Sequence, residues 1–490
     1  MIGARLRLVL ASGATAALLG PPAWFWQDSL LPDVYSVMDM GQADTGGGPP
    51  HAHGGGRDVA TLAADPSRPP DVDVTMTARK QRFRLATGRE IDGYTLDGGS
   101  PGPTIRATVG QLVQVRLVNE SVPDGVTLHW HGVDVPNAAD GVAGVTQDAV
   151  PPGRDHVYRF VADRAGTYWY HSHQLSHTQV IRGLLGALVV DPAGGAAGGA
   201  VERDPSDVDQ LALAHLYDGV RTVNGREGDL AVAAAPGARA RIRVVNTDNG
   251  PMSVWVAGTP YRLVAIDGTD VVGPTPVTGA SVLVTAGARA DLDVTMPAGG
   301  TGVRVHLGGP TGVVLGTAPP PARQPAAALD PLTYGTPAPL GFDPAAARRT
   351  FRYDIGRRPG FLNGRPGMWW TVNGRQYPDT PMFVVGAGDV VRMRISNHSG
   401  DLHPMHLHGH HAVVLARDGV PAGGSPWWVD SLNVANGESY DVAFVADNPG
   451  IWTDHCHNLP HAAEGLVVHL MYEGVTTRYV IGGATGNTPE

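Results

Sequence analysis

The tripeptide His455-Cys456-His457, followed by His461, is the part of this chain best suited to chemistry. Cys456 is the only cysteine in 490 residues, so it cannot form an intramolecular disulfide. In an extended strand, alternate side chains point to opposite faces, so the two flanking histidines face one way and the thiol faces the other. One strand can therefore serve two metal sites. A thiolate combined with imidazoles favours copper and electron transfer.

Three further histidine clusters extend this pattern. They are His129 with His131, His171 with His173, and His403 with His406 and His408. In a strand, residues two apart share a face, so each i, i+2 pair presents two imidazoles together. A single pair could be a chance surface feature, but four clusters and a lone cysteine favour several metal ions.

The four segments resemble, in the same order, the copper signatures of the multicopper oxidases, the laccase-like enzymes. They read TLHWHG at Thr127–Gly132, WYHSH at Trp169–His173, HPMHLHG at His403–Gly409 and HCHNLPHAAEGL at His455–Leu466. The resemblance spans roughly residues 70 to 475 and includes DGVAGVTQ at Asp140–Gln147.

This resemblance implies four copper ions. By position, the type 1 copper ligands are His403, Cys456 and His461, and the type 2 ligands are His129 and His406. The ligands of the type 3 pair are His131, His171, His173, His408, His455 and His457. The trinuclear cluster of type 2 and type 3 copper then takes four histidines from the first domain and four from the third, and it lies between these domains.

The resemblance also implies the route of electrons. Phenols or aromatic amines would give up single electrons at His461, which pass through Cys456 to its histidine neighbours, and dioxygen would be reduced to two waters. Asp140 matches an acidic position that relays protons in similar enzymes, although a turn-forming aspartate beside Gly141 explains it equally well. Asp140, His461 and Cys456 are therefore the catalytic candidates.

Several positions near the type 1 site depart from the common pattern. Leu466 stands where many members carry an axial methionine, and losing that weak donor should raise the copper potential. Ala462 replaces a glutamate found in many bacterial relatives; Glu464 and Asp454 are the acidic residues considered as substitutes. Trp427, Trp428 and Asp430 either line a substrate pocket or include a buried aromatic pair.

Composition predicts an all-β chain. Glycine (66) and proline (41) are abundant and charged residues make up only 17%, which suits short strands and tight turns. Together with the resemblance, this predicts three tandem cupredoxin-like Greek-key β-sandwich domains at residues 71–192, 205–318 and 346–476. The second holds no copper ligand and acts as a spacer, and its isolated histidines, His215 and His306, are packing residues.

The N-terminus predicts an extracytoplasmic location. Residues 1–30 carry Arg5 and Arg7 and then a largely apolar run, which fits a cleaved signal or an uncleaved membrane anchor. The protein would be secreted or attached to the outer face of the cytoplasmic membrane. Residues 31–70 predict a flexible linker, in which His51 and His53 are at best weak metal ligands.

The partners follow from these features. We expect dioxygen and a small aromatic reductant, and no nucleic acid, because the net charge is −10 and there is no basic stripe. A metal-ion oxidase acting on Cu(I) or Mn(II) in copper homeostasis is the main alternative, although the 11 methionines are scattered. A copper-free structural scaffold is the third possibility, but scaffolds of this kind lose ligands, and all the ligand positions are filled.

Overall fold

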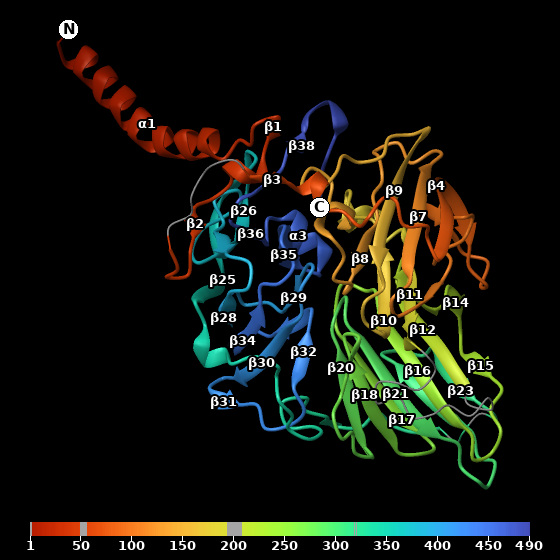
Figure 1. Ribbon diagram of the computed structural model, residues 1–490. Coiled ribbons are helices and arrows are strands. Elements are labelled where there is room, and N and C mark those ends of the chain that lie inside the picture. The colour runs from red at the N-terminus through yellow and green to blue at the C-terminus, as the bar shows by residue number, and fades with distance from the viewer. Residues whose placement is uncertain (1, 50–55, 194–207, 318, 320) are drawn as a thin grey trace.

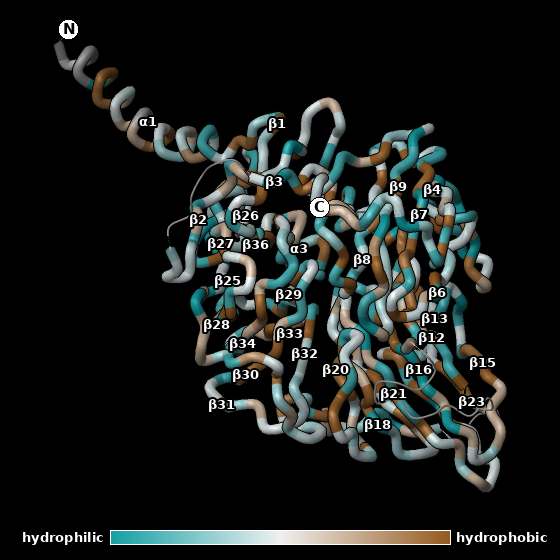
Figure 2. The backbone as a smooth tube through the Cα atoms, in the orientation of Figure 1, coloured by the Kyte–Doolittle hydropathy of each residue, from teal (hydrophilic) through white to brown (hydrophobic). Residues whose placement is uncertain are grey.

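The computed structural model describes residues 2–49, 56–193, 208–317, 319 and 321–490. Its described residues are mostly strands, arranged in three sandwiches of two sheets each (Figure 1). Hydrophobic and hydrophilic residues alternate along many strands (Figure 2). In β7 (Leu112–Asn119), for example, Val113, Val115 and Leu117 are fully buried while Arg116 faces solvent. The predicted all-β class is therefore confirmed, because period-2 patterning buries one face of each sheet.

The first sandwich pairs two four-stranded sheets. One contains, in spatial order, β6 (Ile105–Thr108), β11 (Leu185–Asp191), β10 (Gly166–His171) and β8 (His129–His131). The other contains β5 (Glu90–Leu96), β4 (Val72–Arg84), β7 and β9 (Arg154–Val161). Trp130, Tyr158, Phe160 and Tyr170 fill the space between them.

The second sandwich has its own hydrophobic core. Its larger sheet contains β14 (Arg226–Glu227), β13 (Val220–Val223), β12 (Val208–Tyr217), β16 (Arg239–Asn246), β21 (Arg289–Thr295), β18 (Tyr261–Ile266) and β19 (Thr269–Asp270). The smaller sheet contains β15 (Leu230–Val232), β23 (Gly312–Leu315), β22 (Val303–Leu307), β17 (Met252–Ala257), β20 (Ala280–Val284) and β24 (Ala327–Ala328).

The third sandwich combines a six-stranded and a seven-stranded sheet. The first contains β2 (Ala43–Asp44), β27 (Met382–Val385), β36 (Val467–Tyr472), β35 (Ile451–Cys456), β29 (His403–Leu407) and β33 (Ser431–Val434). The second contains β26 (Arg365–Val372), β25 (Arg349–Leu362), β28 (Val390–Asn397), β34 (Ser439–Val445), β30 (Ala412–Arg417) and β31 (Val420–Pro421), and β32 (Trp427–Val429) pairs with β30.

Helices are few among the described residues. Besides the N-terminal α1 (Ile2–Asp28) there are two short helices, α2 (Ser176–Gln179) and α3 (Leu459–Ala463). The single turns of 3-10 helix are η1 (Val37–Asp39), η2 (Val59–Thr61), η3 (Asn137–Ala139), η5 (Pro344–Ala346) and η6 (Gly483–Thr485). Within the described part of the chain, α1 alone is long and apolar enough to cross a membrane, and it projects from the body beside the third sandwich (Figure 1).

The prediction of a flexible linker at residues 31–70 is wrong for much of that segment. β1 (Val34–Tyr35) pairs with β38 (Ile481–Gly482), β2 extends a sheet of the third sandwich, and β3 (Arg57–Asp58) pairs with β37 (Val475–Thr476). Backbone pairing with the third sandwich and the strands that follow it orders the segment despite its glycines and prolines. His51 and His53 lie outside the described residues.

Candidate metal centres

Two pairs of antiparallel strands carry most of the candidate ligands. In the first sandwich, β10 pairs with β8 so that His171 lies opposite His129. In the third sandwich, β35 pairs with β29 so that His455 lies opposite His406. Residues opposite each other across antiparallel strands point to the same face, so each sandwich presents a patch of imidazoles. The same pairing sets Met405 against Cys456, on the other face of the third sandwich's sheet.

The two patches meet in one buried cluster between the first and third sandwiches. His129 Nε2 lies 3.4 Å from His406 Nε2. His455 Nε2 lies 3.4 Å from His173 Nε2 and 3.3 Å from His408 Nε2. Each contact joins nitrogens of two buried rings, and the first two contacts link the two sandwiches. This arrangement brings lone pairs to a common point, as a shared metal requires.

A second group of rings completes the cluster. The ring centroids of His131, His171 and His457 lie 4.9 to 5.7 Å apart. All three side chains are at most 1% exposed. The structure therefore brings together all eight histidines that the sequence assigned to the trinuclear cluster.

Hydrogen bonds fix one nitrogen of several rings and leave the other free. His129 Nδ1 donates to Asp140 Oδ1 at 3.1 Å, and His408 Nδ1 donates to Asp140 Oδ2 at 3.1 Å. His406 Nδ1 donates to the Asp430 carbonyl at 2.9 Å. An outer partner of this kind sets the tautomer and the orientation of a ligand ring. The Nε2 atoms of these three rings consequently face the centre of the cluster.

In His131 and His171, too, one ring nitrogen is hydrogen-bonded and the other is left without a partner. His131 Nε2 donates to Asp430 Oδ1 at 3.2 Å and lies 3.0 Å from Ser431 Oγ, while its Nδ1 has no partner. His171 Nδ1 donates to the Ser172 carbonyl at 3.0 Å, and its Nε2 has no partner. Buried polar atoms without partners are costly, so a metal ion bound at these two nitrogens would satisfy them.

Burial also keeps the imidazoles in the form that binds metals. It lowers the pKa of the seven rings His131, His171, His173, His406, His408, His455 and His457, and repulsion between neighbouring rings adds to the effect. At neutral pH these rings are uncharged and offer lone pairs without first losing a proton.

A separate site surrounds the lone thiol. Cys456 Sγ lies 3.6 Å from His403 Nδ1 and 3.8 Å from His461 Nδ1, and the two nitrogens lie 3.2 Å apart. Ser399 Oγ bonds His403 Nε2 at 2.7 Å, which leaves Nδ1 for a metal. Burial raises the pKa of the Cys456 thiol, so a cation is needed to hold the thiolate there. His461 alone of the three is only half-buried.

The donor sets fit copper at both places. A thiolate with two imidazoles in a triangle is the soft, low-coordinate environment that copper prefers for electron transfer. The larger cluster offers imidazoles alone, which suit copper among other transition metals. The two sites are joined by adjacent residues of the chain. Cys456, at the end of β35, belongs to the thiol site, and its neighbours His455 and His457 belong to the imidazole cluster.

The second sandwich does more than separate the other two, which corrects the expectation of a simple spacer. A Cβ on Gly287 would lie 2.7 Å from His131 Cε1 and 3.1 Å from His457 Cδ2, so only glycine lets this backbone approach the cluster. Arg289 is fully buried and forms a bidentate pair with Asp430 at 2.6 and 2.7 Å. Its Nε donates to the Thr167 carbonyl of the first sandwich.

Asp430 connects this arginine to the histidines. Burial would raise the pKa of Asp430, but Arg289 and the donating histidines outweigh it and hold the pKa well below its usual range. Asp267 bonds the Arg289 backbone N–H at 2.9 Å and lies 3.6 Å from its guanidinium. The ionised Asp430 thus accepts from His131 while a cation from another domain balances its charge.

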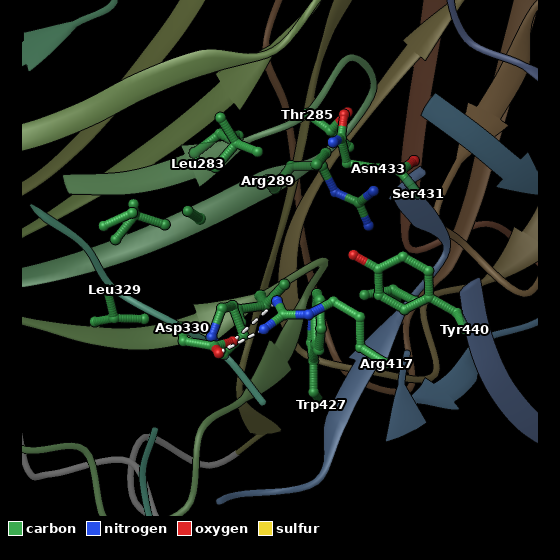
Figure 3. Close-up of a pocket in the computed structure, with 18 of the residues that line it drawn as sticks. Leu283, Thr285, Arg289, Leu329, Asp330, Arg417, Trp427, Ser431, Asn433 and Tyr440 are labelled. Carbon is green, nitrogen blue, oxygen red and sulfur yellow. Dashed lines mark hydrogen bonds and ion pairs between the residues drawn. The ribbon is translucent and has the colours of Figure 1, made fainter. Parts of the chain in front are cut away.

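The expected substrate pocket is only partly present. Trp427 lines a cavity of about 370 Å³ between the second and third sandwiches, where Arg417 pairs with Asp330 (Figure 3). The lining reaches Ser431, which bonds His131, but includes none of the three residues around the thiol. Asp430 is buried in the charge network instead, and Trp428 packs against Phe342.

Other histidines make their contacts outside the two sites. His410 bonds Tyr472 Oη at 2.7 Å, and His411 bonds Asp134 and the Asp267 carbonyl. Burial would lower the pKa of His411, but Asp134 and Asp430 raise it to about 9. His306 stacks on Trp255 and His215 bonds Thr247, as expected of packing residues.

The two substitutes considered for the missing relay glutamate lie away from the histidine cluster. Glu464 accepts from Trp370 Nε1 at 2.9 Å, and Trp370 packs on His461 beside the thiol site. Asp454 lies 3.5 Å from Tyr353 Oη inside the third sandwich, and burial raises its pKa.

Sequence reasoning missed Arg289, Asp267, Ser431 and Glu490. The buried Glu490 Oε1 lies 3.5 Å from His455 Nδ1 and 3.9 Å from His173 Nε2, and burial raises the pKa of its carboxyl. Arg289 and Asp267 sit far from every histidine motif in the chain, and Ser431 directly follows the candidate Asp430 but has no signal of its own.

Comparisons with known proteins agree with this architecture. Two family models described as multicopper oxidase match residues 77–194 and 351–474. The multicopper oxidase MmcO of Mycobacterium tuberculosis is 28% identical over 482 residues, covering 85% of this chain and 91% of that protein. Laccase-1 of Botryotinia fuckeliana is 27% identical and covers 82% of each chain.

A solved structure shows the same fold. The multi-copper oxidase of Pseudomonas thermotolerans superposes with a TM-score of 0.67 and 27% identity, covering 82% of this chain and 98% of that one. This chain belongs to the multicopper oxidase family and is an oxidoreductase. Its fold is the expected series of cupredoxin-like sandwiches, and membership in the family implies bound copper. The domain boundaries and the ligand of each copper remain predictions.

Replacing Arg289 tests the charge network that joins the three sandwiches. Arg289→Met leaves the buried carboxylates of Asp267 and Asp430 without their cation, and we expect a loss of about 3–5 kcal/mol in unfolding free energy. Arg417→Met, at the half-exposed ion pair in the same interface, should cost about 1 kcal/mol or less. Urea titrations of the two variants should differ accordingly, and equal midpoints would contradict the role of Arg289.

Replacing Leu466 tests how the lack of a thioether at this position would affect the thiol site. Leu466 is fully buried and its carbonyl accepts from the Cys456 N–H at 3.1 Å, so a longer thioether at this position can reach the thiol site. Leu466→Met should lower the potential of a copper held at the thiol site, as measured in a redox titration, because an added weak thioether donor would favour the cupric state. Leu470→Met, a buried exchange on β36, serves as the control and should leave the potential unchanged.

Proposed function

We propose that this protein is a laccase-like oxidase that takes single electrons from phenols or aromatic amines and reduces dioxygen to two waters. The observation that supports this most strongly is the single strand β35, which leads from the thiol site to the imidazole cluster. Four electrons must be collected one at a time and delivered together. Two adjoining sites with different donors serve these two tasks.

We assign the ligands by combining geometry with the family pattern. His403, Cys456 and His461 would hold a type 1 copper. His129 and His406 would hold a type 2 copper, and His131, His171, His173, His408, His455 and His457 would hold the type 3 pair. When bound, the coppers supply one-electron acceptance at the first site and four-electron reduction of dioxygen at the second.

The chain's own residues orient and isolate these sites. His461 is the half-buried member of its site and is the place where a reductant's electrons would enter. The covalent path from Cys456 to the adjacent histidines then needs no diffusing carrier. Asp140 holds two cluster histidines by hydrogen bonds and, being fully buried, is placed to pass protons to the oxygen site. The surrounding burial excludes bulk water from the cluster.

The N-terminal helix supports attachment to the outer face of the cytoplasmic membrane. Arg7–Asp28 is 22 residues long with a mean hydropathy of 1.4, and none of it is buried against the protein. This length crosses the hydrocarbon core of a bilayer. The two arginines that precede the apolar run favour the cytoplasmic side for the N-terminus, so the sandwiches would lie outside.

Steady-state oxidation under air tests the substrate class. Four coppers per chain and blue absorbance are confirmed first. The kcat/KM values of a phenol, an aromatic amine, Cu(I) and Mn(II) are then measured on the same copper-loaded protein and compared. We expect the two aromatic compounds to have kcat/KM values at least tenfold above those of the metal ions. A preference for Cu(I) or Mn(II) would instead establish the metal-ion oxidase, and a chain that binds no copper would be a structural scaffold.

Replacing Asp140 tests proton delivery. Asp140→Asn keeps an oxygen that accepts from the histidines but cannot carry a proton, so we expect kcat to fall by about 10²-fold with copper content retained. Asp148→Asn, an exposed carboxylate in the same segment, is the control. The pH profile of kcat distinguishes a proton relay from a turn-forming residue. An unchanged profile in Asp140→Asn would mean that Asp140 forms the turn and does not relay protons.

A further inference from the structure

The end of α1 that approaches the body is aromatic. Trp24, Phe25 and Trp26 lie near the end of the helix and are 61%, 55% and 45% exposed, so the protein itself covers them only in part. Aromatic side chains gather where a membrane-spanning helix crosses from hydrocarbon into the headgroup region. The sequence order of apolar helix and aromatic end therefore places the membrane surface near residue 26.

The same helix end is fastened to the turn of the β25–β26 hairpin. The N–H of Asn363 donates to the Ser29 carbonyl at 2.9 Å, and the N–H of Gly364 donates to Ser29 Oγ at 3.1 Å. A Cβ on Gly364 would lie 2.9 Å from Trp26 Nε1 and 3.0 Å from Leu30 Cδ2. These contacts hold the hairpin turn at the level where the helix leaves the membrane.

The hairpin and the turn that follows it carry positive charge in a chain of net charge −10. The sequence from Arg357 to Arg375 includes four arginines and no acidic residue. Arg358 and Arg365, on either side of the turn, are exposed. Exposed basic residues beside a membrane helix are attracted to anionic lipid headgroups. The charge pattern therefore favours contact between this hairpin and the bilayer.

The proposed electron-entry site lies directly behind this hairpin. The Trp370 ring of β26 lies 4.5 Å from the His461 ring, and the Arg357 guanidinium covers Trp370 at 4.5 Å. A Cβ on Gly465, just after α3, would lie 3.8 Å from Leu362 Cδ2 near the hairpin turn. The helix exit, the basic hairpin and His461 thus share one side of the molecule.

We infer that the basic hairpin rests on the bilayer and that the reductant is a lipid-dissolved hydroquinone, which reaches the His461 face from the membrane. The inference rests on the proposed oxidase function, because a hydroquinone is a diphenol. Two hydroquinones give up four electrons and four protons and become two quinones. One dioxygen takes up those electrons and protons and becomes two waters.

The position of the hairpin is tested by fluorescence quenching in vesicles of phosphatidylcholine and phosphatidylglycerol. Met368→Cys on β26 and Val420→Cys on β31 lie at opposite edges of one sheet and are 46% and 57% exposed before replacement. Cys456 is fully buried, so a thiol-reactive fluorophore labels the introduced residue in the full-length protein. We expect headgroup-bound quenchers to quench the label at 368 at least threefold more than the label at 420. Equal quenching would overturn the inference.

The reductant is tested with a long-chain hydroquinone in those vesicles and a water-soluble hydroquinone in buffer. Arg358→Glu with Arg365→Glu should slow oxidation of the long-chain compound at least tenfold and leave the water-soluble one unchanged. Lys80→Glu with Arg89→Glu, an equal charge change on the first sandwich, should affect neither. If the variant with both hairpin arginines replaced by glutamate oxidises the long-chain hydroquinone at the normal rate, the inference fails. If the unaltered protein oxidises neither hydroquinone, the proposed function fails instead.

Discussion

The structure depends on a constraint that acts on most of the buried imidazoles. A histidine has two ring nitrogens, and a hydrogen bond to one of them fixes the ring and leaves the other for a metal. Asp140 holds His129 and His408, and Asp430 holds His131 and His406. These acceptors orient rings that come from two different sandwiches. Burial also lowers the pKa of His131, His406 and His408 and keeps these rings uncharged, so the cluster is preorganised for a metal.

The cost of this arrangement is buried charge, and the second sandwich offsets it. Arg289 and the donating histidines hold Asp430 ionised, and without them a carboxylate inside a protein is highly unfavourable. Arg289 supplies the balancing cation and also bonds the first sandwich through the Thr167 carbonyl. A domain without ligands thereby fixes the interface in which the ligands meet.

The two sites differ in their access to solvent, which matches the tasks proposed for them. The imidazole cluster is enclosed by all three sandwiches, whereas His461 is half-buried beneath the β25–β26 hairpin. The N-terminal segment reinforces this side, since Tyr35 bonds Tyr377 at 2.6 Å and β1 pairs with β38. The electron-entry side is therefore also the side from which α1 projects, which links the chemistry to the location of the protein.

The sequence by itself determined the strand content, the family and the residues that converge, because alternation along a strand is a local property. The alternation of His455, Cys456 and His457 predicts ligands on both faces of one strand without any knowledge of the fold. Tertiary structure alone decided how those residues are supported. Arg289 and Asp267 lie more than 90 residues from the nearest cluster histidine in sequence, and only the packing of three domains brings their charges to Asp430. The prediction of a flexible linker at residues 31–70 was wrong for the same reason, since backbone pairing with distant strands outweighed the segment's local preference for disorder.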